Sequence, residues 1–289
     1  MKIGKAVIPA AGWGTRFLPA TKVLPKEMLP LLDKPLMQYI VEEAISCGIG
    51  QIIIVTSFGK GAMEDHFDRD FELEYILEQK GEKGLLEKVR HIADLATICY
   101  IRQKEQLGLG HAILTAKELV GDEPFAVLLP DDIFDAKVPM LKQALDVSQR
   151  YEGSVVAVRR VAREEVRRYG IIEPKQIEER VYQVLDLVEK PEPEEAPSDL
   201  AILGRYVLTP EIFKMLEVTP PGKGGEIQLT DGIRLLLQEQ MVYGYEFEGQ
   251  YYDAGKPLGL LKAAVALGLN HPEMGADFRE YLRGLVADL

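Results

Sequence analysis

The chain has 289 residues, is 47% hydrophobic and carries a formal net charge of -12 at pH 7. This length suits one large α/β domain or two smaller ones, with enough apolar material for a core. An acidic chain without an extended basic stripe lacks the electrostatic footprint of a nucleic-acid-binding protein. No segment approaches the roughly 18 apolar residues of a membrane span, and the first apolar run is too short for a signal peptide. We therefore expect a cytoplasmic protein that binds neither nucleic acid nor a membrane.

Cysteines and histidines are too few and too scattered to predict a disulfide framework or a zinc site. The chain holds only Cys47 and Cys99, and its four histidines show neither HExxH nor any paired spacing. Zinc chemistry is therefore not expected.

Apolar runs in the first half alternate with segments of helical periodicity. The runs span residues 6–9, 51–56, 97–101 and 125–129, and helices are expected at 36–47, 85–95 and 111–119. This alternation predicts parallel βαβ units, in which ligands bind beyond the carboxyl ends of the strands. Residues 10–16 and 130–132 would both lie at that edge of the sheet.

The second half is less regular and predicts a sheet extension or a hairpin insert. Strands are expected at 154–159, 180–189 and 200–208, around a turn-rich segment at 169–176, with a solvated loop at 190–198. Helices are expected at 225–238, 258–269 and 277–286. Since no internal repeat or convincing break occurs, we predict a single domain over residues 1–289, with halves at about 1–135 and 136–289.

The stretch AAGWGTR from Ala10 to Arg16 is typical of a polyphosphate cradle at a strand end. Its small residues let backbone N–H groups approach an anion, and Arg16, Lys22 and Lys26 add cationic side chains. Residues 1–30 contain five basic residues and one acid in an otherwise acidic chain. A nucleoside triphosphate explains this local reversal, because fixed cations bind a small anion that the overall field repels. On residue types alone, a glycine-rich turn with incidental lysines is the alternative.

Two common nucleotide-binding motifs are incomplete. The Gly12-Trp13-Gly14 stretch lacks the third glycine of GxGxxG, which disfavours an NAD-dependent oxidoreductase. Residues 221–225 do not complete GxxxxGK[ST]. A nucleotide must therefore be held in another way.

Eight motifs, the first of which contains this stretch, occur in order over nearly the whole chain: AAGWGTRFLPATKVLPKEMLPLLDKP from Ala10, RQKEQLGLGHA from Arg102, LPDD from Leu129, YGIIE from Tyr169, VEKP from Val188, GRYVL from Gly204, GEIQLTD from Gly225 and YDAG from Tyr252. Together they resemble the bacterial glucose-1-phosphate uridylyltransferases, also called UDP-glucose pyrophosphorylases. The resemblance implies a Rossmann-like, three-layer α/β nucleotidyltransferase fold with a mixed, mostly parallel central sheet and a sugar-binding β insert. The first half of the chain would bind the nucleotide, and the second half would bind the sugar.

The resemblance also implies a reaction. UTP and α-D-glucose 1-phosphate would give UDP-glucose and pyrophosphate by direct in-line attack, assisted by Mg²⁺. A phosphate monoester is largely ionised at neutral pH, so the attacking group needs no general base. Positioning and charge neutralisation would supply most of the catalysis.

The resemblance assigns the nucleotide site to three segments. The base would lie against Ala10, Ala11 and Gly12, and the triphosphate against Gly14, Thr15 and Arg16. Arg16 and Lys26 would hold the departing pyrophosphate, because fixed cations stabilise the charge that develops there. The uracil edge would be recognised by Gln103, with Gly108 allowing close approach of the backbone. His111 is expected to be a packing or supporting residue and not a general base.

Carboxylates and a lysine from later motifs are expected to complete the site. The resemblance assigns Mg²⁺ to Asp131 and Asp253, although a turn aspartate is the alternative for Asp253. Alternation along the chain would point the side chain of Asp132 the other way. The catalytic residues would thus be Arg16, Lys26, Asp131 and Lys190. The sugar phosphate would be bound by Gly170, Glu189, Lys190, Gly204 and Glu226.

Several alternatives stay open. Glu226 lies at an expected helix start, where a capping role is equally consistent with the sequence, and Lys22 could be a solvated lysine. A glucose-1-phosphate thymidylyltransferase is the second candidate activity, and a non-catalytic regulatory paralogue is the third. Trp13 and Ala254 depart from residues common in the family. The resemblance also suggests a homodimer or homotetramer.

Overall fold

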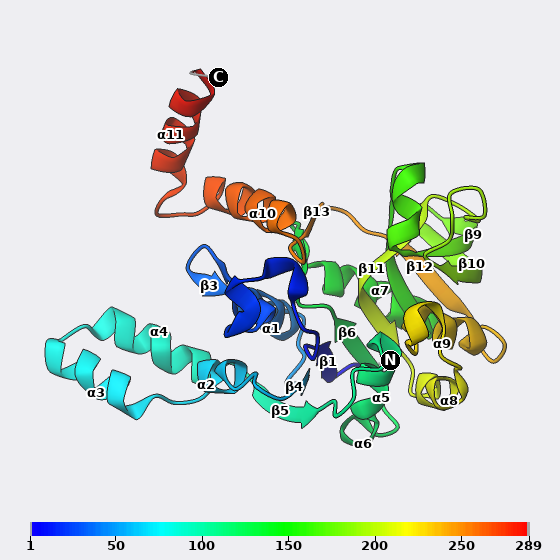
Figure 1. Ribbon diagram of the computed structural model, residues 1–289, viewed down its shortest axis with the longest axis horizontal. Helices are drawn as coiled ribbons and strands as arrows, with labels where there is room; N and C mark the ends of the chain where they lie inside the picture. The colour runs from blue at the N-terminus through cyan, green and yellow to red at the C-terminus, as the bar shows by residue number, and fades with distance from the viewer. Residues whose placement is uncertain (1, 288–289) are drawn as a thin grey trace.

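The computed structural model describes residues 2–287 and has a nine-stranded mixed sheet between two layers of helices (Figure 1). The order of the strands is β5-β4-β1-β6-β11-β8-β12-β10-β9. Their bounds are β1 Lys5–Pro9, β4 Gln51–Thr56, β5 Thr97–Arg102, β6 Phe125–Leu128, β8 Ser154–Arg160, β9 Gly170–Glu178, β10 Val181–Glu189, β11 Leu200–Leu208 and β12 Val242–Glu246. Strands β10 and β11 run opposite to the rest, so the expected mixed, mostly parallel sheet is confirmed.

Eleven α-helices lie among the described residues. They are α1 Leu36–Ser46, α2 Ala62–Phe67, α3 Phe71–Lys80, α4 Lys83–Ala93, α5 Leu109–Thr115, α6 Lys117–Val120, α7 Met140–Tyr151, α8 Glu211–Val218, α9 Leu229–Leu236, α10 Pro257–Leu269 and α11 Gly275–Ala287. Two short ribbons, β2 Pro30–Leu31 with β3 Lys34–Pro35 and β7 Asp132–Asp135 with β13 Gln250–Asp253, lie beside the main sheet. None of the helices within residues 2–287 has both the length and the apolar character to cross a membrane.

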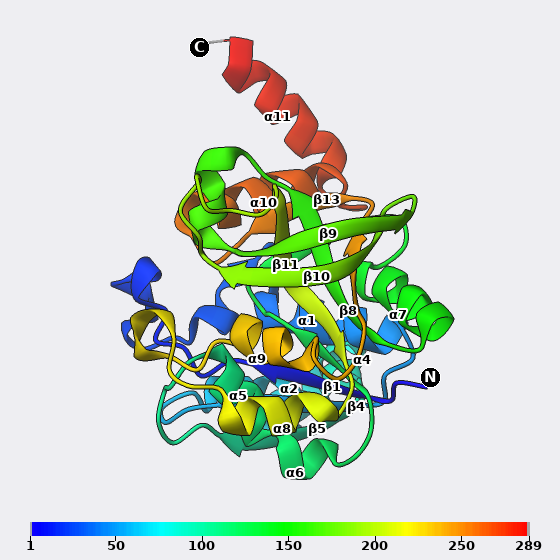
Figure 2. The same cartoon turned by 90° about the vertical axis from the view of Figure 1, so that its right-hand side faces the viewer.

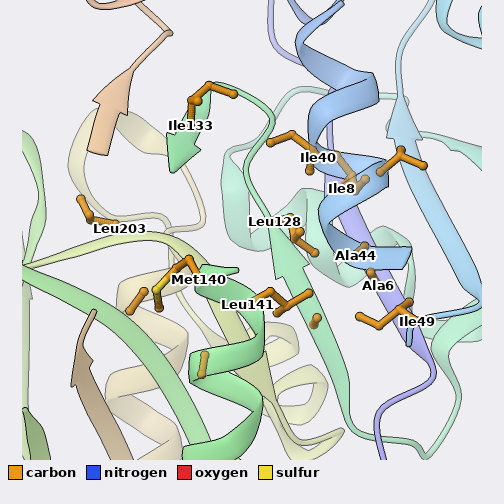
Figure 3. Packing of buried hydrophobic residues seen from close by; sticks show 14 of the residues in the cluster. Ala6, Ile8, Ile40, Ala44, Ile49, Leu128, Ile133, Met140, Leu141 and Leu203 are labelled. Atoms are coloured by element: carbon orange, nitrogen blue, oxygen red, sulfur yellow. The ribbon is translucent and has the colours of Figure 1, made fainter. Parts of the chain in front are cut away.

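Alternation along the central strand β1 separates the core into two layers. Ala6 and Ile8 face a cluster that includes α1 and α7, as Figure 3 shows, whereas Val7 faces the cluster beneath α5, α8 and α9. All three side chains are fully buried, as expected for a strand covered by helices on both faces. Burying the Val7 and Ile8 side chains contributes about 1.5–3 kcal/mol each. This packing holds the carboxyl end of β1, and therefore the loop after it, in one place.

The segment expected to be turn-rich is instead an edge strand, and that expectation was wrong. Strand β9 runs from Gly170 to Glu178 and pairs with β10 in antiparallel fashion, with a register shift between Val184 and Asp186. Pro174 lies opposite Val184, next to this irregularity. A proline is tolerated in an edge strand near a bulge because no ladder hydrogen bond is lost there.

Helices α3 and α4 form a hairpin that projects from the body at the lower left of Figure 1, and α11 projects from the top of the molecule in both views (Figures 1 and 2). Neither α2 nor α3 was expected from the sequence. The hairpin is tied by Glu74, which accepts hydrogen bonds from Arg69 Nη2 at 2.5 Å and from Arg90 Nε at 2.8 Å. Two arginines thus converge on one carboxylate of α3.

These arginines make the stability of the hairpin depend on pH. Hydrogen bonds lower the pKa of Glu74 from 4.5 to about 2, and the one from Arg69 has a larger effect than the one from Arg90. Because the folded-state pKa is lowered, the stabilisation is complete above pH 4.5 and is lost as the pH falls towards 2. Glu74→Gln should therefore lower the thermal midpoint at pH 7, with a difference that shrinks as the pH falls towards 2. Calorimetry at several pH values checks this, with the exposed Glu72→Gln as control; a difference independent of pH would contradict it.

Candidate active site

The loop after β1 owes its shape to glycine and to its contacts with residues 21–26. Gly14 has φ 67°, a left-handed conformation that favours glycine. A Cβ at Gly14 would lie 3.0 Å from Lys26 Cβ, so the loop packs this closely because residue 14 has no side chain. Thr21 Oγ1 donates to the Gly14 carbonyl at 2.7 Å. The short 3₁₀ turn Thr15–Phe17 then carries Arg16.

Two cavities adjoin at the carboxyl ends of the strands. The first, of about 640 Å³, is lined by the loop after β1 and by the segment after β5. The second, of about 480 Å³, is lined mainly by residues from the second half of the chain. The residues that line both are Arg16, Leu109, Leu129, Asp131 and Glu226. A ligand in one cavity would therefore lie next to a ligand in the other at Asp131.

Asp131 forms an ion pair with Lys26, whose Nζ lies 2.6 Å from Oδ2. Burial alone would raise the pKa of Asp131, but Lys26 outweighs it and holds the pKa below its ordinary value. Burial alone would lower the pKa of Lys26, but Asp131 and Glu27 hold it above its ordinary value. Both groups are thus charged at neutral pH, as an anion-binding lysine and a metal-binding carboxylate require.

A second, deeper ion pair lies behind Lys26. Lys60 Nζ, from the loop after β4, is 2.9 Å from Glu27 Oε2 and also donates to the Ala10 carbonyl. Burial raises the pKa of Glu27 and lowers the pKa of Lys60. Glu27 Oε1 is buried without a hydrogen-bond partner among the described residues. The sequence offered no sign of this pair because its members are 33 residues apart.

Asp132 points away from Asp131, as alternation predicted. Its Oδ2 accepts from Gly204 N at 2.7 Å and its Oδ1 from the Tyr251 hydroxyl at 2.7 Å. Burial, followed by the nearby Asp131 charge, raises the pKa of Asp132 to about 7. A Cβ at Gly204 would lie only 2.2 Å from Asp132 Oδ2, so this contact requires glycine.

Asp131 and Asp253 face the same point, although they are 122 residues apart. A Cβ placed on Gly255 would lie 2.7 Å from Asp131 Oδ2 and 3.1 Å from Asp253 Oδ1, so the glycine leaves a gap between the carboxylates. Arg168 and Lys256 hold Asp253 Oδ2 at 2.9 and 3.0 Å. Within residues 2–287, no three His, Cys, Asp or Glu side chains gather closely enough to hold a metal ion. Two carboxylates still fit Mg²⁺, which takes its other ligands from substrate phosphates and water.

The segment after β5 closes the first cavity. Gln103 Nε2 donates to the Gly108 carbonyl at 3.2 Å and lies 2.8 Å from His111 Nδ1. The carboxamide oxygen of Gln103 is therefore the group that remains to bind a nucleobase. His111 thus supports Gln103, as expected. Gln106, which the sequence did not single out, donates to the Ala11 carbonyl at 2.7 Å and joins the two loops. Trp13 is 76% exposed at the rim of this cavity.

The second cavity contains the sugar-phosphate residues that the resemblance implied. Glu189 accepts from Thr230 Oγ1 at 2.6 Å and pairs with Lys190 Nζ at 2.7 Å. A Cβ on Gly170 would meet Thr230 Oγ1 at 2.8 Å, which explains the glycine. The structure thus brings together a glycine of β9, the carboxylate at the end of β10, the lysine that follows it and a hydroxyl group of α9.

Glu226 is not at a helix start, so a helix-capping role is wrong. Helix α9 begins at Leu229, and Glu226 is in extended conformation with φ -99°. Its Oε2 accepts from Gln228 Nε2 at 3.2 Å. Glu226 instead lines both cavities at the point where they meet.

Comparison with known proteins shows the class of protein to which this chain belongs. Residues 5–268 match the model of the nucleotidyl transferase family, which covers the sheet and both cavities. The curated UTP–glucose-1-phosphate uridylyltransferases of Staphylococcus epidermidis and Staphylococcus haemolyticus are 56% and 54% identical to this chain over 284 residues. In each case the match covers 98% of this chain and 99% of the relative.

Solved structures agree with these relatives. A UDP-glucose pyrophosphorylase complexed with UDP-glucose is 46% identical, with a TM-score of 0.85, over 93% of this chain and 100% of its own. A UTP-bound enzyme of the same kind from Acinetobacter baumannii is 42% identical, with a TM-score of 0.91, over 97% of this chain and 99% of its own. The chain therefore belongs to the UTP–glucose-1-phosphate uridylyltransferase family of nucleotidyltransferases. The expected family and fold class are thereby confirmed.

Proposed function

We propose that this enzyme transfers the uridylyl group of UTP to α-D-glucose 1-phosphate and releases pyrophosphate. The observation that carries the proposal is the junction of two cavities at Asp131. UTP occupies the first cavity, with its base against residues 10–12, Gln103 and Gly108. Glucose 1-phosphate occupies the second cavity, against Glu189 and Lys190. The phosphate oxygen of the sugar then faces the α-phosphorus of UTP.

Transfer at this junction needs positioning and charge neutralisation. Lys190 holds the attacking phosphate, while Arg16 and Lys26 stabilise the pyrophosphate as it leaves. Gly14 and Thr15 place backbone groups along the triphosphate. Because the attacking phosphate is already ionised, the chain's residues need not remove a proton.

Asp131 and Asp253 would hold Mg²⁺ across the gap at Gly255. When bound, the ion neutralises charge on the α-phosphate and orients it. Lys26, whose Nζ lies 2.6 Å from Asp131 Oδ2, would place its positive charge beside the phosphates. Gly170, Gly204 and Glu226 complete the sugar side of the junction.

Lys190→Met should raise KM for glucose 1-phosphate about tenfold to hundredfold, because a hydrogen bond to a charged group contributes about 1.5–3 kcal/mol. The KM for UTP should change less than twofold, since Lys190 lines only the second cavity. Initial rates at varied concentrations of each substrate measure both values. Lys214→Met, at an exposed position on α8, is the control. An equal rise in both KM values would contradict the assignment.

The choice of nucleotide is tested by pyrophosphate release with UTP, dTTP, ATP and GTP at equal concentrations. We expect UTP to give the largest kcat/KM. A preference for dTTP would replace this proposal with thymidylyl transfer. Tight UDP-glucose binding without turnover of any nucleotide would favour the non-catalytic paralogue.

We also propose that the chain is one domain, acts in the cytoplasm and forms a homodimer or homotetramer. Support for an oligomer comes from α10, an apolar helix on which Leu258 and Leu261 are 63% and 61% exposed. Light scattering after size-exclusion chromatography tests the oligomeric state, and a monomer would contradict it.

A further inference from the structure

Arg205 is a fully buried cation that lies beneath the junction of the two cavities and lines neither of them. Its side chain has 0% exposure, and its partner Glu43, on α1, is 14% exposed. Arg205 Nη2 lies 2.6 Å from Glu43 Oε2, and Nε lies 3.1 Å from the same oxygen. The guanidinium also packs over the Phe134 ring, 4.7 Å from its centroid. A charge this deeply buried needs an explanation, because removing it from water is costly.

The remaining N–H groups of Arg205 bind the turn that carries Asp131. Nη1 donates to the Leu129 carbonyl at 3.2 Å and Nη2 to the Asp132 carbonyl at 3.0 Å. Asp132 N donates to the Leu129 carbonyl at 3.3 Å, so these four residues form a β-turn with Pro130 at its second position. One planar side chain therefore holds both ends of the turn whose third residue is Asp131.

The same group joins this turn to the elements around it. Arg205 Nη1 also donates to the Gly204 carbonyl at 2.9 Å, and that carbonyl accepts from Leu129 N at 2.9 Å. Glu43 accepts from Leu141 N, at the start of α7, at 3.0 Å. Helix α1, strand β11, the turn and α7 thus meet at one ion pair.

We propose that Arg205 is a positioning residue that fixes the Leu129–Asp132 turn, so that Asp131 faces the junction of the two cavities while Asp132 binds Gly204 in the second. This inference rests on the proposed function. A buried ion pair replaced by apolar groups of similar size often leaves stability unchanged or increased, so stability alone does not explain Arg205. Lysine cannot replace it, because one ammonium lacks the planar fork that reaches Glu43 and two carbonyls together.

The test compares the wild-type enzyme with Arg205→Lys and with the double variant Arg205→Met/Glu43→Leu. Arg90→Lys, which alters an arginine–carboxylate pair on the distant hairpin, is the matched control. The wild-type enzyme is assayed first with UTP, glucose 1-phosphate and MgCl₂, and an inactive wild type would reject the proposed function itself. Calorimetry of each variant then shows whether it is folded at the assay temperature.

Both Arg205 variants should lose about 10²-fold in kcat, because misplacing a reacting group by about 1 Å has this effect. Their KM for UTP should stay within threefold of the wild type, since the hydrogen bonds of Arg205 go to Glu43, Leu129, Gly204 and Asp132 and not to the loop after β1. Mn²⁺ binding, followed by electron paramagnetic resonance without glucose 1-phosphate, should weaken about tenfold. A folded Arg205→Lys enzyme with wild-type kcat and Mn²⁺ affinity would overturn the proposal. If the double variant does not fold, the result for Arg205→Lys alone decides between the two outcomes.

Discussion

Asp131→Asn is expected to reduce kcat by about 10³-fold, the upper end of the loss seen when one group that stabilises a transition state is removed. The amide keeps the shape of the side chain but cannot hold a divalent cation or pair with Lys26 as a carboxylate does. Steady-state rates at saturating UTP and glucose 1-phosphate measure the loss.

Asp135→Asn is the matched control, because Asp135 lies four residues further along, on β7, and lines neither cavity. Its kcat should remain within twofold of the wild type. If Asp131→Asn were folded and retained more than one tenth of the wild-type kcat, Asp131 could not have the role proposed for it.

Lys26→Met is expected to reduce kcat/KM for UTP by about 10³-fold, because Lys26 would neutralise the pyrophosphate that leaves. The same change removes the cation that lowers the pKa of Asp131, so that pKa should rise. The loss should appear in kcat as well as in KM, since the leaving charge develops during the reaction.

Lys22→Met supplies the control for Lys26, and it also decides the role of Lys22. Lys22 is exposed and lines neither cavity. Its replacement should lower kcat/KM for UTP less than tenfold. Equal losses in the two variants would show that general positive charge, and not contact with the pyrophosphate, explains the effect.

Local patterns predicted the main-sheet strands of the nucleotide half, but not its helices α2 and α3. The apolar run before Ala10 and the glycines after it predicted a strand followed by a loop, and β1 ends at Pro9. The expected strand at 51–56 matches β4. These elements follow from local periodicity and from burial on both faces of the sheet.

Other features depend on contacts that no local pattern encodes. Residues 169–176 were expected to be turn-rich, but pairing of β9 with β10 outweighs this local preference. Asp253 reaches the junction because β13 pairs with β7, which places Asp253 opposite Asp132. The Lys60–Glu27 pair arises in the same way, from the packing of two loops. The residue types suggested a nucleotide site and a sugar-phosphate site, but only the fold shows that the two cavities share Asp131.

Uridylyl transfer is tested by product analysis after UTP labelled at the α-phosphorus is incubated with α-D-glucose 1-phosphate, MgCl₂ and the purified enzyme. We expect the label to appear in UDP-glucose, with one unlabelled pyrophosphate released for each UDP-glucose formed. No labelled UDP-glucose, or label released as free phosphate, would contradict uridylyl transfer at the junction of the two cavities.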